Sequence, residues 1–93
     1  MALFLALIAA AVAPTAGETG RVLTANGCAQ CHDGALATAK PAALAVFDLR
    51  DPAWGTRMSG PQLRAMLGRL RRAPRDDLDR VRRFVDAELQ RRK

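Results

Sequence analysis

The 93-residue chain has few of the side chains from which metal and catalytic sites are usually built. It contains one histidine, two cysteines and no tyrosine. A structural zinc site takes four nitrogen or sulfur ligands, so the three present here fall one short unless a carboxylate joins them. This scarcity argues against a closed structural metal site.

Large apolar side chains are also scarce beyond the N-terminus. After residue 17 the only aromatic residues are Phe47, Trp54 and Phe84. A domain of about 76 residues has a marginal apolar core and usually needs a staple such as a bound group. The composition therefore favours a large apolar ligand at the centre of the domain over a self-sufficient globule.

The sequence lacks the two-residue alternation of strands and shows no internal repeat. Helical spacing of leucines and methionine follows Ser59, whose pairing with Gln62 has the form of a capping box, and Pro74 ends that segment. The helices predicted from these patterns cover residues 20–26, 42–49, 59–73 and 75–93. The fold class predicted from the sequence is all-α.

Residues 2–13 form an apolar run, ALFLALIAAAVA, with no Lys or Arg before it. Such a run is typical of a secretory signal peptide and is too short to span a bilayer. Pro14 disfavours a cut directly before it, so cleavage after Ala16 or Gly17 suits the small-residue rule better. We expect a signal peptide (or an N-terminal membrane tether, if uncleaved) over residues 1–17 and a periplasmic or otherwise exported domain over residues 18–93.

Both cysteines and the only histidine lie within residues 27–34, GCAQCHDG. On one helical turn Cys28 and Cys31 share a face, so both thiols can reach the vinyl groups of one porphyrin edge. His32 then projects beneath the ring, where its imidazole can bind iron. A plain disulfide would leave His32 without a role, and a thioredoxin-like dithiol expects a neighbouring strand. We predict one covalent haem c held by these three residues.

With this motif the chain resembles the small monohaem class I cytochromes c of bacteria, from Gly20 to the C-terminal helix. The resemblance also includes Gly20, eight residues before Cys28, and Trp54-Gly55 followed by Met58. It implies a small cytochrome c-like helical domain wrapped around one haem. Two helical segments follow Met58 here, whereas one is usual in the family.

The resemblance implies roles for two further residues. The Pro41 carbonyl would accept the Nδ1–H of His32, a bond that orients the ring and raises its basicity towards iron. Trp54 would donate its indole N–H to a haem propionate. The alternative for Trp54 is a partly buried aromatic with a hydrated polar edge, which fits any tryptophan.

Met58 is the predicted sixth ligand of the iron, because it follows Trp54-Gly55 in a predicted loop from which a thioether can be aimed at iron. Met66 lies in the middle of a predicted helix, where packing is the usual use of a methionine. Two alternatives stay open at this point: Met66 as the ligand, or no methionine ligand and an open iron.

The function predicted from the sequence is an exported single-haem carrier of one electron between redox partners. No side chain is required as an acid, base or nucleophile, so we do not predict an enzyme. One alternative is a five-coordinate haem protein that binds a small gas or peroxide. Another is a haem-bearing accessory subunit of a membrane redox complex.

Charge is divided unevenly along the chain. Residues 1–56 carry three basic and four acidic side chains, whereas residues 57–93 carry twelve and five. A basic half attracts nucleic acid, an anionic membrane or an acidic protein. Since export argues against nucleic acid, we expect acidic redox proteins as partners.

Overall fold

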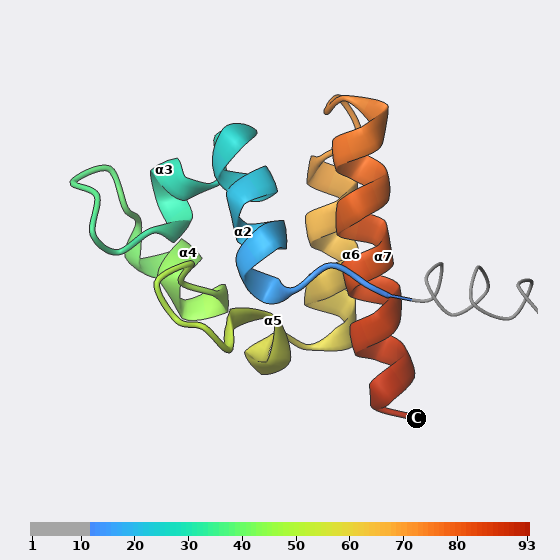
Figure 1. The fold of residues 1–93 in the computed structure, drawn as a ribbon. Coiled ribbons are helices and arrows are strands. Elements are labelled where there is room, and N and C mark those ends of the chain that lie inside the picture. The colour runs from blue at the N-terminus through green and yellow to red at the C-terminus, as the bar shows by residue number, and fades with distance from the viewer. Residues whose placement is uncertain (1–11) are drawn as a thin grey trace, which may run out of the picture.

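The computed structural model describes residues 12–93, and in this part of the chain it contains helices and no strand (Figure 1). The all-α prediction is confirmed there. None of the described helices is long and apolar enough to cross a membrane. The helices are α2 (Ala16–Ala25), α3 (Ala29–His32), α4 (Pro41–Val46), α5 (Trp54–Arg57), α6 (Gly60–Arg69) and α7 (Arg75–Arg91).

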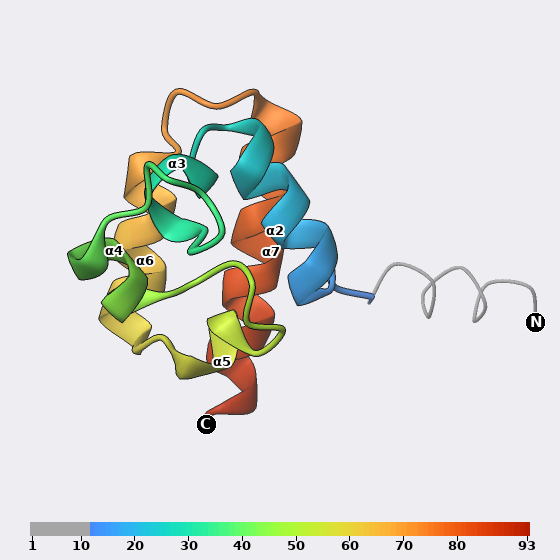
Figure 2. The same ribbon diagram turned by 90° about the vertical axis from the view of Figure 1, so that its left-hand side faces the viewer.

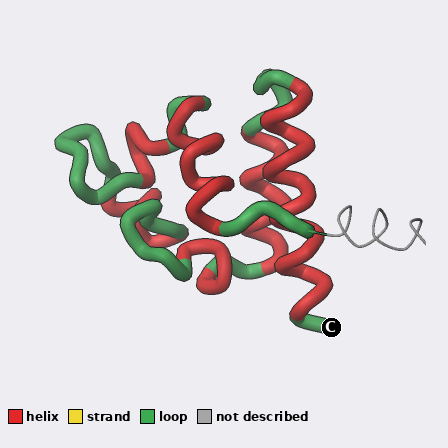
Figure 3. The backbone as a smooth tube through the Cα atoms, viewed as in Figure 1, coloured by secondary structure: helices red, strands yellow, loops and turns green. Residues whose placement is uncertain are grey.

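The helices divide into two regions that differ in regularity. Helices α6 and α7 form an antiparallel hairpin, and α2 packs against α7 (Figures 1 and 2). We call these three helices the helical core. Helices α3, α4 and α5 are short, and loops make up much of the chain between them (Figure 3). We call residues 28–58 the site lobe.

The second half of the chain folds largely as its sequence predicts. Ser59 caps α6, because its Oγ accepts from the Gln62 backbone N–H at 3.1 Å and the Gln62 Oε1 accepts from the Ser59 backbone N–H at 2.9 Å. Helix α6 ends at Arg69, earlier than predicted, and Pro74 is instead the N-cap residue of α7. The capping box predicted from sequence is therefore confirmed.

Helix α2 begins before the predicted helix over residues 20–26. Thr15 closes a capping box with Glu18: the Thr15 Oγ1 accepts from the Glu18 N–H at 3.1 Å, and Glu18 accepts from the Thr15 N–H at 3.1 Å. The boundary predicted at residue 17 therefore falls inside α2. Residues 1–11, which hold most of the predicted signal peptide, lie outside the described residues.

The core lies between α7, α6, α2 and the segment that carries α5. Helix α5 is a single turn in a stretch that the sequence predicts to be a loop. It approaches α7 closely, since a Cβ added to Gly55 would lie 2.5 Å from the Phe84 ring. The buried core residues are Leu23, Phe47, Trp54, Met58, Leu63, Met66, Leu70, Val81, Phe84 and Val85.

Candidate functional site

A glycine turn places the cysteine motif directly after α2. Gly27 has a φ of 86°, the left-handed conformation that commonly ends a helix. Its N–H donates to the Thr24 carbonyl at 3.1 Å, and the Cys28 N–H donates to the Leu23 carbonyl at 3.0 Å. These two bonds form a Schellman motif, so the chain reverses and starts α3 at once.

Cys28, Cys31 and His32 occupy one helical turn, as their spacing predicts. The N–H groups of Cys31 and His32 both donate to the Cys28 carbonyl, at 3.3 and 3.1 Å. Both cysteines are free thiols, and both are half-buried. Two thiols on one turn can therefore react with a single group that lies beside α3.

The Cys28 thiol packs against the hydrophobic core of the protein. Burial raises the pKa of this thiol above its ordinary value, although its own backbone N–H and the charge of Arg69 act in the opposite direction. A redox-active or nucleophilic cysteine depends on a lowered pKa. The environment of Cys28 therefore does not favour thiol–disulfide exchange.

The His32 ring is fixed by a backbone carbonyl, although not the predicted one. Its Nδ1 lies 3.1 Å from the carbonyl oxygen of Phe47. Because a carbonyl can only accept, Nδ1 is the donor in this contact, and in the neutral tautomer Nε2 keeps the lone pair with which a histidine binds a metal. Pro41, the predicted acceptor, is instead the first residue of α4. The hydrogen-bond acceptor for His32 is thus the carbonyl of Phe47, six residues after Pro41.

The segment that carries Phe47 also holds the main chain around His32. The Leu49 N–H donates to the His32 carbonyl at 2.7 Å, and the Lys40 N–H donates to the Cys31 carbonyl at 3.2 Å. The Asp48 carboxylate accepts from the Gly34 N–H at 3.2 Å. The loop after α4 therefore fixes the backbone and the ring of the histidine together.

Stacked aromatic rings connect His32 to the helical core. The rings of His32 and Phe47 are parallel, with centroids 3.7 Å apart and an interplanar angle of 4°. The ring centroids of Phe47 and Trp54 are 5.4 Å apart, and those of Trp54 and Phe84 of α7 are 5.1 Å apart. The orientation of the histidine is thus coupled to the packing of α5 against α7.

Trp54 has a hydrogen-bond partner within the protein. Its indole N–H donates to the Ala16 carbonyl at 3.3 Å, at the start of α2. The side chain is 2% exposed. In this structure the indole therefore joins α5 to α2, and a propionate contact remains a prediction.

Both candidate methionines are buried. Met58 directly follows α5 and is 2% exposed, and Met66 in α6 is 5% exposed. Both belong to the core cluster that contains Phe47 and against which Cys28 packs. Both thioethers therefore lie in the core against which Cys28 packs, and the burial of the two residues does not choose between them.

The donor types found here are those that a covalent haem uses. They are two free thiols on one turn, a histidine whose Nδ1 contacts a carbonyl, and two buried methionines of the core cluster against which Cys28 packs. Across residues 12–93 no group of three or more His, Cys, Asp or Glu side chains is arranged to hold a metal ion. A haem iron takes one protein donor on each face, so His32 and one methionine suffice.

Scans of the chain against family models, curated proteins and solved structures find no match.

Two residues important to the site are absent from the sequence-based prediction. Phe47 was noted only as one of the few aromatic residues, inside the helix predicted over residues 42–49, because nothing in the sequence marks its carbonyl. Glu88 was not predicted to be buried, although its spacing of seven from Val81 places it on the buried stripe of α7.

Proposed function

We propose that the protein is an exported single-haem c-type cytochrome that carries one electron at a time between redox proteins. The observation that supports it most directly is the contact between His32 Nδ1 and the Phe47 carbonyl oxygen at 3.1 Å. His32 shares one helical turn with the free thiols of Cys28 and Cys31. Metal-binding histidines usually have such a partner on the second ring nitrogen, which fixes the ring and raises its basicity.

Each residue of the site has a defined task in this proposal. Cys28 and Cys31 would hold the haem through two thioethers, and His32 Nε2 would bind the iron. Met58 would supply the second protein ligand, and thioether ligation raises the reduction potential. A covalent haem would supply reversible exchange between Fe(III) and Fe(II). The buried core around Phe47 limits access of water and so influences that potential.

The distribution of charge supports an acidic partner that docks near the cysteine motif. The exposed arginines at the turn between α6 and α7 are Arg69, Arg71, Arg72 and Arg75. Arg69 is close enough to Cys28 for its charge to oppose the rise in the thiol pKa that burial causes. We call these four residues the basic turn, and Arg69 is the member that lies near the cysteine motif.

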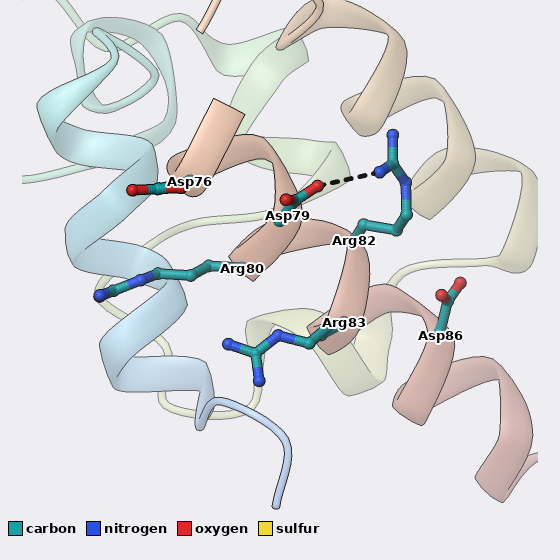
Figure 4. A pocket seen from close by; sticks show the side chains of 6 residues that line it. All are labelled: Asp76, Asp79, Arg80, Arg82, Arg83 and Asp86. Atoms are coloured by element: carbon teal, nitrogen blue, oxygen red, sulfur yellow. Dashed lines mark hydrogen bonds and ion pairs between the residues drawn. The ribbon is translucent and has the colours of Figure 1, made fainter. Parts of the chain in front are cut away.

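The outward face of α7 has a different character. It carries acidic and basic side chains side by side, and Arg82 pairs with Asp79 at 3.1 Å (Figure 4). Mixed charges of this kind cancel over short distances and give little long-range attraction. The residues of this mixed face are Asp76, Asp79, Arg80, Arg82, Arg83 and Asp86. The basic turn is thus the more favourable surface for an acidic partner.

Extraction of the cofactor tests the proposed attachment. Protein matured in a host that exports it and attaches haem covalently should keep its colour after acid–acetone extraction, because a haem bound through thioethers stays on the protein. Replacing Cys28 or Cys31 by Ala should leave one thioether, and replacing both should release all of the colour. Wild-type protein that loses its colour completely would refute covalent haem.

Ionic strength tests the proposed partner. Electron transfer to an acidic redox protein should slow as salt is added, because salt screens the attraction. The triple change Arg69→Glu, Arg71→Glu, Arg72→Glu should slow it several-fold, mainly through association. The control with the same charge change is Arg21→Glu, Arg80→Glu, Arg83→Glu, away from the basic turn. Equal slowing by both sets would refute a dedicated docking surface.

A further inference from the structure

Helix α7 buries a carboxylate near its C-terminal end. Glu88 as a whole residue is 3% exposed, and its carboxylate accepts hydrogen bonds from Arg91 and Arg92. Burial of a charge is unfavourable unless it is paired and hydrogen-bonded. The pairing therefore fixes the positions of both guanidinium groups as well as that of Glu88.

Arg92 makes contacts that Arg91 does not. Its Nη2 donates to the carbonyls of Gly55 and Thr56, at 3.1 and 3.2 Å, as well as to Glu88 at 3.2 Å. Both carbonyls belong to α5. The backbone N–H of Met58 also donates to the Gly55 carbonyl, at 3.3 Å. The C-terminal end of α7 is thus bonded to the segment that presents Met58.

Helix α5 cannot hold this position by itself. It has four residues and no side-chain cap, and so short a helix is unstable in isolation. Its place depends on contacts with other elements: the stacking of Trp54 on Phe84, the Trp54 bond to the Ala16 carbonyl, the close approach of Gly55 to Phe84, and the Arg92 bonds. Of these, the Arg92 bonds are the hydrogen bonds made to the α5 backbone that leads to Met58.

We propose that Glu88 and Arg92 are positioning residues that keep Met58 on the iron. This inference rests on the proposed function and extends it to the stability of the axial ligand. Glu88 holds Arg92 in place, and Arg92 holds the α5 carbonyls. Loss of either residue would free the segment from residue 55 to 58 and let the thioether leave the iron more often.

The rate at which an external ligand displaces methionine tests this role. With the haem-loaded protein, imidazole binding to the ferric form and carbon monoxide binding to the ferrous form both require Met58 to leave first. Arg92→Met, which keeps an apolar side chain of similar length, should speed both reactions at saturating ligand about tenfold or more, as expected for loss of hydrogen bonds from a charged group. Glu88→Gln should speed them by a smaller factor.

Arg91→Met is the matched control. Arg91 also pairs with Glu88 and carries the same charge, but it has no bond to α5. It should leave the displacement rates within about twofold of wild type, as is usual for an exposed side chain. Val81→Ala, at a fully buried site of α7, controls for overall stability: it should lower the free energy of unfolding without speeding ligand displacement.

The spectrum separates failure of this inference from failure of the proposed function. A far-red charge-transfer band in ferric wild type that Met58→Ala removes, together with fast displacement only in the Arg92 and Glu88 variants, supports the inference. The same band with unchanged rates in Arg92→Met overturns it and leaves the electron-carrier proposal intact. A band lost in Met66→Ala instead overturns it too, and absence of covalent haem overturns both.

Discussion

The helical core and the site lobe are held together in different ways. Helices α2, α6 and α7 bury side chains along their length, whereas α4 buries none, α3 buries only Ala29 and α5 buries Trp54 and Gly55. The site lobe is held also by hydrogen bonds between distant backbone atoms and by the aromatic stack that begins at His32. The helical core therefore contains most of the apolar burial, and the lobe depends on the contacts of a few residues.

Among the changes considered, replacement of His32 should disturb the site lobe most. His32→Ala removes the Phe47 carbonyl contact, the ring stack and the predicted iron ligand at one position. No second histidine is present to replace it. We expect loss of the native haem spectrum and little cooperatively folded protein, measured by visible absorption and by thermal unfolding.

Gln30→Ala is a suitable control, because Gln30 lies in the same helical turn and is exposed. It should unfold like wild type, within about 0.5 kcal/mol. A His32→Ala chain that folds cooperatively without haem would show that the site lobe needs neither the histidine nor the cofactor.

The regions also differ in how far the sequence predicts them. The capping box at Ser59 and the apolar stripe of α7 are local patterns, so the hairpin could be predicted from them. The start of α2 could not, since the small residues near Thr15 also suit a cleavage site. Helix α5 was not predicted because it depends on Phe84, which lies far along the chain.

The site shows the same division between local and distant information. The single turn of Cys28, Cys31 and His32 follows from spacing alone, and the structure has it. The acceptor for His32 depends on where α4 ends, and α4 ends before Phe47 rather than at residue 49. A local motif therefore predicted that the three side chains share one turn, whereas the carbonyl that orients His32 could be found only from the three-dimensional structure.

The two buried methionines provide the next comparison, one on each side of the boundary between the regions. Met58→Ala and Met66→Ala should each destabilise the protein by about 2–5 kcal/mol, the usual cost of truncating a buried methionine. Only Met58→Ala should also abolish the far-red ferric band and open the iron to carbon monoxide. Denaturant unfolding and absorption spectra of the loaded protein measure the two effects separately.

A different outcome would identify the ligand in another way. If the band survives Met58→Ala and disappears in Met66→Ala, the iron ligand comes from α6. If wild-type protein has no such band and binds carbon monoxide readily, the five-coordinate gas-binding alternative gains support over the electron carrier.

The N-terminal cap of α2 should have a smaller effect. Thr15→Ala removes a capping box and should cost about 1 kcal/mol of stability. Thr24→Ala, in the same helix but exposed, should change the stability by less than about 0.5 kcal/mol.

Truncation tests the same cap. A chain that begins at Glu18, at the predicted domain boundary, should be less stable than one that begins at Pro14, because the shorter chain lacks both Thr15 and the Ala16 carbonyl that accepts from Trp54. Equal stability of the two chains would show that this cap contributes nothing.

The smallest expected effect concerns Asp48, which joins two loops of the site lobe. Its carboxylate bonds to the Arg50 guanidinium at 3.0 Å and accepts from the Gly34 N–H at 3.2 Å, and the Arg50 bond above all lowers the Asp48 pKa from 3.8 to about 2. Because the folded pKa is lowered, the contribution of Asp48 to stability is complete above pH 3.8 and is lost as the pH falls towards about 2. The melting temperature of Asp48→Asn should therefore lie slightly below that of wild type at neutral pH, and the two should converge in that acid range. The difference should also shrink in high salt, since the ion pair is exposed. Asp86→Asn, on the mixed face of α7, should show no such convergence, and a wild-type advantage over Asp48→Asn that persists unchanged to pH 2 would refute this role of the carboxylate.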